Sequence, residues 1–258
     1  MKWDTIELKE CESTFNEARR YPAWTVVSAE KQTQGRGRFN RTWIGERGGL
    51  WATYNVPLNP AEDTPWGLLP LVAGVAIMQA LSKYAIPGLR LRWPNDVLVG
   101  RAKLAGILVE RPTEHLGSIG IGINVFNDVQ SLTGRVQDPP ARLADLVAPC
   151  PTVATVRTQL ADAISATYRL FVQGGIAALA PALAAAWAGE REVEVITDAG
   201  SICGTFTGVS DNGSPILRRT DGTLITIPGI EVNRMKEKPQ SERDLLQGVD
   251  PDLSLIEK

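Results

Sequence analysis

The sequence predicts an α/β domain followed by a small β-barrel. Short apolar runs bounded by turn residues alternate with helical patterns through the first part of the chain, and beyond Gly189 only short strands and turns follow. The chain has 258 residues, which is enough for one sizeable domain and a small second one. We therefore expect a large domain over residues 1–188, a small β domain over 189–236 and a charged tail over 237–258.

Strands dominate the first half of the chain, where apolar runs end at Gly, Pro, Asn or Asp. The predicted strands cover residues 24–30, 50–56, 89–93, 97–99, 103–110 and 118–125. Residues 66–84 carry apolar side chains at helical spacing, with Thr64 and Pro65 as the cap and first-turn pair. This helix is expected to cover one face of the sheet.

The second half begins with helices and ends with strands. Residues 153–173 and 176–188 show helical patterns, separated by a Gly-Gly pair. Short strands are predicted at 192–197, 201–209, 215–219 and 223–227, joined by turns that contain Asp and Gly. This pattern is typical of a small β-barrel, and the charged remainder from Lys236 predicts a loosely attached tail.

Composition excludes several classes of protein. The formal net charge is −2 without a long basic run, so electrostatic binding of nucleic acid is not expected as the main activity. One histidine, His115 in a turn, and three scattered cysteines exclude a histidine-rich metal cluster and paired cysteine motifs. A secretory signal and an apolar stretch of roughly 20 residues are both missing, so we expect a cytoplasmic protein without a membrane partner.

The segment 32–43 carries Arg36, Arg38 and Arg41 among glycines. Glycine lets the backbone turn closely around a ligand, and the arginine fork suits phosphate or carboxylate oxygens. We interpret the segment as a mobile anion-clamping loop that does not form a strand interior. A solvated basic loop or a nucleic-acid contact remains an alternative. A dinucleotide fingerprint is excluded, because Asn40 stands where its last glycine belongs.

A second group of polar residues surrounds the turn after residues 89–93. Strand alternation ends at Pro94, and Asn95 and Asp96 follow, which is also the pattern of an ordinary β-turn. Lys103 then opens a mostly buried strand. Because an unpaired buried ammonium is costly, we expect Lys103 to meet an anion, with an edge-strand lysine as the alternative.

The strand at 118–125 alternates isoleucine with small residues. One of its faces therefore presents Gly120, Gly122 and Asn124. We expect this face to be left open, either for a ligand or for the close approach of another backbone.

Taken in order, these motifs resemble the signature of the biotin protein ligases. The matching segments are Gln32-Thr33-Gln34-Gly35-Arg36-Gly37-Arg38, Arg92-Trp93-Pro94-Asn95-Asp96, Lys103-Leu104-Ala105-Gly106-Ile107-Leu108 and residues 120–124. The resemblance covers about residues 6–236 and includes Ser13-Thr14. It implies a mixed β-sheet flanked by helices, similar to class II synthetases, and a C-terminal SH3-like barrel after Trp187.

The resemblance also implies a reaction and its partners. Such an enzyme activates biotin with ATP and Mg²⁺ to biotinyl-5'-AMP and transfers biotin to a lysine of a biotin carboxyl carrier protein. No protein ligand for the metal is identified in the sequence. A homodimer is compatible with the resemblance. Some relatives carry an N-terminal DNA-binding domain, but Ser13-Thr14 follows the first residue too closely for one, so DNA is not an expected partner.

Matching the motifs residue by residue implies three groups of site residues. The implied catalytic residues are Lys103, Arg38 and Asp96. The implied biotin-binding residues are Ser13, Thr14, Gln32, Arg36, Arg38, Lys103, Gly106 and Gly120. The implied ATP- and adenylate-binding residues are Arg36, Arg38, Arg41, Trp43, Asn95, Lys103, Gly122 and Asn124.

Three positions depart from the family pattern. Phe15 replaces an asparagine, Asn40 replaces a loop glycine, and Arg92 replaces a lysine, which preserves charge but not geometry. A lipoate or octanoate ligase of the same superfamily is the nearest alternative, although its arginine-rich, triple-glycine motif is missing. A non-enzymatic nucleic-acid-binding module is a more distant alternative, because the barrel lacks interleaved basic and aromatic residues.

Overall fold

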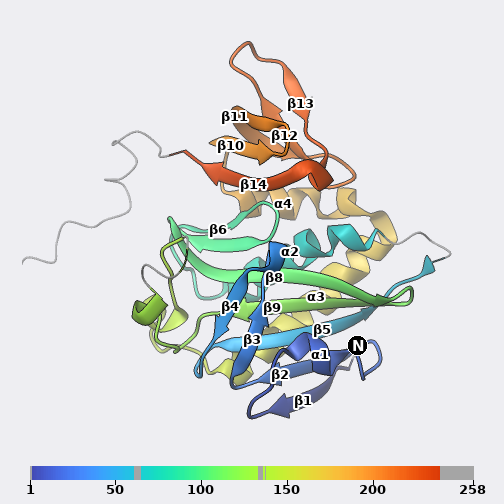
Figure 1. Cartoon of the computed structure of the whole chain (residues 1–258), viewed down its shortest axis with the longest axis vertical. Helices are drawn as coiled ribbons and strands as arrows, with labels where there is room; N and C mark the ends of the chain where they lie inside the picture. The colour runs from blue at the N-terminus through green and yellow to red at the C-terminus, as the bar shows by residue number, and fades with distance from the viewer. Residues whose placement is uncertain (1, 61–64, 133–135, 137, 239–258) are drawn as a thin grey trace, which may run out of the picture. The chain divides into compact units, whose positions relative to one another are not determined.

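The computed structural model describes residues 2–60, 65–132, 136 and 138–238. The chain divides into two compact units, Met1–Trp187 and Ala188–Lys258. Figure 1 labels their helices and strands. Thr64, the predicted cap residue, and nearly all of the predicted charged tail lie outside the described residues.

The first unit is built on a seven-stranded mixed sheet with the order β1-β2-β5-β9-β8-β7-β6. These strands are β1 (Asp4–Leu8), β2 (Thr25–Ala29), β5 (Leu50–Pro57), β6 (Leu89–Arg92), β7 (Asp96–Val99), β8 (Ala102–Thr113) and β9 (Leu116–Ile123). The β1 and β2 strands are parallel, and the other neighbours are antiparallel. The predicted mixed α/β fold is therefore confirmed, while β1 was not anticipated.

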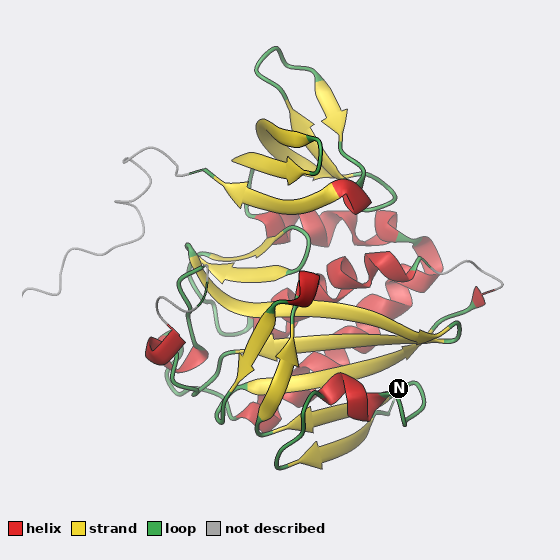
Figure 2. Ribbon diagram, viewed as in Figure 1, coloured by secondary structure: helices red, strands yellow, loops and turns green. Residues whose placement is uncertain are grey.

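Long helices cover the apolar face of this sheet (Figure 2). They are α2 (Leu69–Ser82), which follows the 3-10 turn η3 (Trp66–Leu68), and α3 (Val153–Gly174). Buried isoleucines of β9 and Tyr54 of β5 point toward them, and the Tyr54 hydroxyl donates to the Arg157 carbonyl of α3 at 3.2 Å. Thr152 caps α3 by accepting a hydrogen bond from the Thr155 N–H at 3.1 Å. None of the helices in the described part of the chain is both long and apolar enough to cross a bilayer.

A short helix and a two-stranded ribbon lie on the opposite face (Figure 2). They are α1 (Thr14–Ala18) and the pair β3 (Gln32–Arg36) and β4 (Thr42–Gly45), joined by the 3-10 turn η1 (Arg38–Asn40). The expectation that segment 32–43 forms no strand is wrong. Gly35 explains the pairing, because a Cβ there would lie 2.4 Å from the Trp43 carbonyl oxygen. Only glycine permits the two strands to approach so closely.

Smaller elements complete the first unit. The Gly174-Gly175 pair ends α3, and Gly175 adopts φ 63°. The predicted second helix follows as η6 (Ile176–Leu179) and α4 (Ala180–Trp187). The short 3-10 turns η4 (Gln130–Leu132) and η5 (Leu143–Asp145) lie in the connection before α3.

The second unit is an antiparallel five-stranded sheet with the order β13-β12-β11-β10-β14. Its elements are β10 (Arg191–Thr197), β11 (Gly200–Val209), β12 (Pro215–Arg218), β13 (Leu224–Thr226), η7 (Gly229–Glu231) and β14 (Val232–Glu237). The four predicted strands are present. The tail prediction is wrong for residues 236 and 237, which belong to β14, because this strand pairs with β10 and places Val232 and Met235 in the core.

Candidate active site

The floor of the candidate site is a row of small residues across the sheet. The registers pair Asp96 with Gly106, Gly106 with Gly122, and Gly122 with Trp51. Directly paired residues project to the same face, so Asp96 and Trp51 flank two adjacent glycines. Two residues farther along the same face, Gly120 pairs with Thr53. The predicted glycine face therefore exists, on the side opposite the long helices.

Two aromatic rings lie on this glycine floor. A Cβ on Gly122 would be 2.6 Å from the Trp43 ring, as would a Cβ on Gly106, and a Cβ on Gly120 would be 2.3 Å from the Phe15 ring. The expectation that the glycine face is left open is therefore wrong. The two rings that cover the glycine face come from segments distant in sequence, since Trp43 belongs to β4 and Phe15 to α1. Glycine is required here for the close approach of the chain's own rings.

Polar groups of α1 and β3 meet beside the rings. The Thr14 N–H and hydroxyl both donate to the Gln32 Oε1, at 2.8 and 3.1 Å, and the Thr14 hydroxyl also lies 2.8 Å from that of Thr53. The structure thus brings together Ser13, Thr14 and Gln32, as predicted for one subsite. Within the described residues, the buried Ser13 Oγ and Trp43 Nε1 have no hydrogen-bond partner. Such buried groups are rare in proteins and fit a ligand that supplies the missing contacts.

Lys103 lies over the Trp43 ring. Its Nζ is 5.2 Å from the ring centroid and forms an ion pair with the Asp96 Oδ1 at 2.5 Å. The anion that Lys103 meets in the structure is therefore a carboxylate of its own chain. This arrangement places a cation over an aromatic ring and next to the glycine floor.

Arg92 connects this ion pair to a further acid. Its Nη2 lies 2.6 Å from the Asp96 Oδ2 and 2.6 Å from the Asp138 Oδ2, while its Nη1 donates to the Asp138 Oδ1 at 3.0 Å. Burial alone would lower the pKa of Arg92, but the hydrogen bonds and opposite charges of Asp138 and Asp96 outweigh burial and raise it. Arg92, which replaces the family's lysine, uses its planar fork for two carboxylates.

The arginines of the ribbon have different surroundings. Arg36 lies 5.3 Å over the Phe15 ring and pairs with Glu110 at 3.0 Å. Arg38 is half-buried, and burial lowers its pKa because it disfavours the charged guanidinium, while the charge of Asp96 opposes this effect. Arg41 is exposed. The positive φ of 56° in this turn falls at Phe39, not at the neighbouring Asn40.

Asn95 and Asn124, two of the predicted nucleotide-binding residues, form side-chain hydrogen bonds with backbone carbonyls. The Asn95 amide donates to the Ile107 carbonyl at 2.8 Å. The buried Asn124 donates to the Ala141 carbonyl at 2.9 Å and accepts from Asn127 at 3.0 Å. The structure therefore places both residues at the site's edge and engages their side chains in loop contacts.

Three polar partners, Thr53, Glu110 and Asp138, were not predicted from the sequence. Thr53 lay inside a predicted strand, and only the register with β9 shows that it lies opposite Gly120. Glu110 ends a buried strand, where a charged residue is unusual and signals a partner. Asp138 carried no local signal, because its partner Arg92 is 46 positions away.

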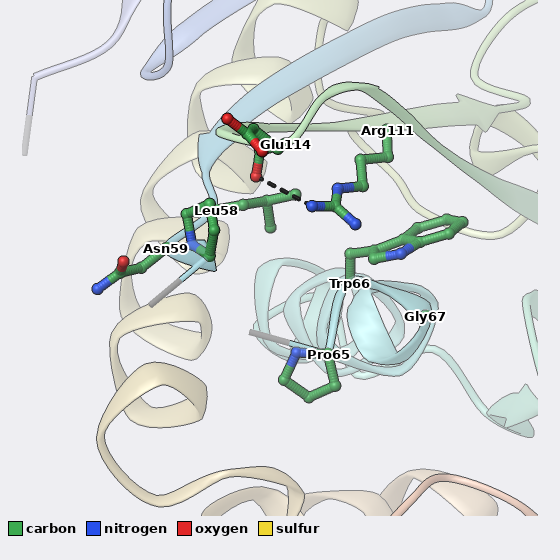
Figure 3. A pocket seen from close by; sticks show the side chains of 8 residues that line it. Leu58, Asn59, Pro65, Trp66, Gly67, Arg111 and Glu114 are labelled. Carbon is green, nitrogen blue, oxygen red and sulfur yellow. Dashed lines mark hydrogen bonds between the residues drawn. The ribbon is translucent and has the colours of Figure 1, made fainter. Parts of the chain in front are cut away.

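A separate pocket of about 360 Å³ opens at the opposite end of the same strands (Figure 3). It is lined by Leu58, Asn59, Pro60, Pro65, Trp66, Gly67, Arg111 and Glu114. Arg111 projects into it and donates to the Glu114 carbonyl at 3.4 Å. None of the predicted site residues lines this pocket. We therefore assign the candidate site to the glycine floor, its two rings and Lys103, and not to this pocket. No three His, Cys, Asp or Glu residues in the described ranges form a metal-binding group.

Comparison with known proteins gives consistent results. Residues 9–124 match the Biotin/lipoate A/B protein ligase family. A biotin–[acetyl-CoA-carboxylase] ligase from Paracoccus denitrificans is 33% identical, over 81% of this chain and 89% of its own length. The bifunctional ligase/repressor BirA of Bacillus subtilis is 37% identical, but the match spans 45% of this chain and only 37% of that protein.

A solved structure extends the likeness to nearly the whole fold. The biotin protein ligase from Aquifex aeolicus, in complex with biotin and ATP, superimposes with a TM-score of 0.77 at 27% identity. The superposition covers 91% of this chain and 99% of the Aquifex chain. With the glycine floor, the lysine and the arginine ribbon, these matches show that the chain belongs to the biotin protein ligases of the biotin/lipoate A/B protein ligase family.

Proposed function

We propose that this protein is an ATP-dependent biotin protein ligase. It would form biotinyl-5'-AMP from biotin and ATP, and then transfer biotin to a lysine of a biotin carboxyl carrier protein. One observation carries the proposal, namely the glycine floor under two aromatic rings with the Lys103 ammonium 5.2 Å from the Trp43 ring. The Aquifex relative, whose structure contains biotin and ATP, supports the same pair of ligands.

Biotin would bind between the α1 segment and the ribbon. Its ureido group carries N–H donors and a carbonyl acceptor, which complement the hydroxyls of Ser13 and Thr14 and the amide of Gln32. The unpartnered Ser13 Oγ is the clearest candidate for such a contact. The rings of Phe15 and Trp43 would contact the apolar part of the ligand, and Gly106 and Gly120 would contribute by letting these rings lie close to the sheet.

ATP would bind beside biotin as its magnesium complex, which enters as a substrate. Trp43, whose ring lies on Gly122, and the ribbon arginines would contact the nucleotide. Asn95 and Asn124 would shape the nucleotide subsite indirectly, through the backbone carbonyls to which they donate. Asp96 and Asp138 are already paired with cations, so the phosphates would supply most of the magnesium ligands.

In the first reaction, a biotin carboxylate oxygen attacks the α-phosphorus of ATP, and the bond to pyrophosphate breaks. Negative charge develops on the phosphate oxygens, and Lys103, Arg36 and Arg38 are the cations that would stabilise it. Fixed charges in a partly buried site act strongly, because they need no reorganisation during the reaction. Positioning the carboxylate against the phosphorus would supply the rest of the rate enhancement.

In the second reaction, the neutral amine of a carrier lysine attacks the acyl carbon, AMP leaves, and the amine loses a proton. Asp96 would orient this amine or the Lys103 ammonium, with which it already forms an ion pair. No covalent intermediate with the protein is needed. We place this activity in the cytoplasm, where ATP is available.

The test is transfer of labelled biotin to a purified biotin carboxyl carrier domain with Mg-ATP, run in parallel with lipoate and octanoate. We expect ATP-dependent labelling with biotin alone. Transfer of only lipoate or octanoate would be consistent with the family but would show that biotin is not the substrate. Binding of single-stranded nucleic acid without any acyl transfer would support the non-enzymatic alternative.

A further inference from the structure

Four charged side chains of alternating sign form a continuous row at the edge of the candidate site. Lys103 pairs with the Asp96 Oδ1 at 2.5 Å, and the Asp96 Oδ2 lies 2.6 Å from the Arg92 Nη2. The guanidinium of Arg92 contacts both oxygens of Asp138, at 3.0 and 2.6 Å. Asp138 therefore belongs to the chain of ion pairs that begins at the lysine next to Trp43.

The bidentate contact limits how Arg92 can meet Asp96. Two parallel hydrogen bonds from a guanidinium to a carboxylate fix the plane and rotation of the arginine fork. With Nη1 and Nη2 both bound to Asp138, only Nη2 also reaches Asp96, and it reaches only Oδ2. The other oxygen, Oδ1, is left for Lys103.

The backbone around Asp138 is held directly to Lys103. The Lys103 N–H donates to the Pro139 carbonyl at 2.6 Å, and the Ala141 N–H donates to the Lys103 carbonyl at 2.9 Å. Asn124 adds a hydrogen bond to the Ala141 carbonyl at 2.9 Å. The same short segment thus fixes Lys103 through its backbone and Arg92 through the side chain of Asp138.

We infer that Asp138 is a positioning residue, which holds Arg92 so that Asp96 keeps one oxygen for Lys103. The inference rests on the proposed function for the role of Lys103 at the phosphate. Without the Asp138 carboxylate, Arg92 and Lys103 would compete for Asp96 alone. The guanidinium of Arg92 can form two hydrogen bonds with the Asp96 carboxylate, whereas the Lys103 ammonium acts as a single point charge. Arg92 would therefore displace Lys103 from Asp96.

The test replaces Asp138 by Asn, which keeps the shape of the side chain but removes its charge. Asp145→Asn is the matched control, because Asp145 also accepts two hydrogen bonds from one arginine, Arg142, on an exposed surface. One readout is acetylation of Lys103 by a limiting reagent, measured by mass spectrometry relative to the exposed Lys9. The other is the rate of biotinyl-5'-AMP formation, resolved into kcat and KM.

In Asp138→Asn, we expect acetylation of Lys103 to rise severalfold, because the ammonium leaves its ion pair. The kcat should fall on the order of tenfold with a smaller change in KM, since a misplaced catalytic group costs rate more than binding. Asp138→Glu retains the carboxylate and should recover most of both values. If the Asn variant does not fold, the test is that acetylation of Lys103 in Asp138→Glu stays near the wild-type value, and a severalfold rise would contradict the inference.

Unchanged acetylation of Lys103 in folded Asp138→Asn would overturn the inference, whatever the enzyme's substrate. The inference would also fail if kcat dropped equally in the Asp145→Asn control. If the wild type transferred no biotin while acetylation of Lys103 still rose in Asp138→Asn, the positioning role would stand and the proposed function would fail. The two failures are therefore distinguishable.

Discussion

The two faces of strands β5, β8 and β9 differ in chemistry, although successive residues of the same strands supply them in alternation. One face carries large buried side chains, among them Leu50, Tyr54 and Ile121, and packs against the long helices. The other face carries Gly106, Gly120, Gly122 and Thr53, and is covered by two rings from distant segments. Stability and ligand chemistry are thus separated by a single step along each strand.

This comparison makes opposite kinds of substitution informative. Removing atoms from the helix-covered face leaves a cavity and lowers the free energy of unfolding. Adding atoms to the glycine face displaces the rings and changes the site. The predictions below test this separation, from the largest expected effect to the smallest.

Lys103→Ala should give the largest effect, and only on activity. Removing the cation should reduce the rate of biotinyl-5'-AMP formation by about 10²–10³, the usual loss when one charge-stabilising donor is deleted. Pyrophosphate release measures this rate. The melting temperature should change little, because Asp96 keeps its contact with Arg92. Lys9→Ala, at an exposed position, is the control. Equal rates in both variants would show that Lys103 does not contribute to biotinyl-5'-AMP formation.

Ile121→Ala should give the reverse result. Its side chain is buried on the helix-covered face, and its loss should lower the free energy of unfolding by about 3 kcal/mol. Urea denaturation measures the change, and biotin affinity of the folded protein should be retained. Leu170→Ala on α3, where Leu170 is 44% exposed, should cost no more than about 0.5 kcal/mol. A loss of biotin affinity in Ile121→Ala without a change in stability would contradict the separation of stability and ligand binding between the two faces.

Gly122→Ala should weaken biotin binding about tenfold, in the range expected when a packed site is overfilled. The new Cβ would lie 2.6 Å from the Trp43 ring, which must then shift. Calorimetric titration with biotin measures the affinity. Gly67→Ala is the matched control, because no atom outside the adjoining chain lies within 4 Å of the position of its Cβ. Tighter or unchanged binding in Gly122→Ala would show that the ring position does not shape the pocket.

The smallest effect concerns an ion pair at the rim of the helix-covered side. Arg157 of α3 donates a hydrogen bond to Glu7 of β1 and thereby lowers the pKa of the Glu7 carboxyl below 4.5, against the opposing effect of burial. A lowered folded-state pKa means that this contribution is present above the unfolded-state pKa and is lost as pH falls through the folded-state value.

Glu7→Gln should therefore reduce the free energy of unfolding at neutral pH by no more than about 0.5 kcal/mol, because Glu7 is 64% exposed and solvent screens the pair. The difference from wild type should shrink below pH 4.5 and disappear on further acidification. Urea denaturation at several pH values measures it, with Glu10→Gln as the control. A difference that grew toward acid would reverse the sign of the assigned shift.

Part of the candidate site followed from local pattern. The alternation of glycine with isoleucine in β9 predicted a face without side chains, and the register confirms that face. The lysine near the start of β8 predicted an anion nearby, and Asp96 forms an ion pair with it. The pattern could not show that Phe15 and Trp43 fill the glycine face, since this depends on where α1 and the β3–β4 ribbon fold back.

The sequence by itself determined the long helices, most of the strands, the α/β class and the residues that share a strand face, because these depend on neighbours a few positions apart. The tertiary structure alone decided which distant groups meet. Asp138 lies 46 positions from Arg92, and Thr14 lies 39 from Thr53. Their contacts depend on sheet register and on chain reversals, in which a shift of one residue would turn the glycine face away from the site.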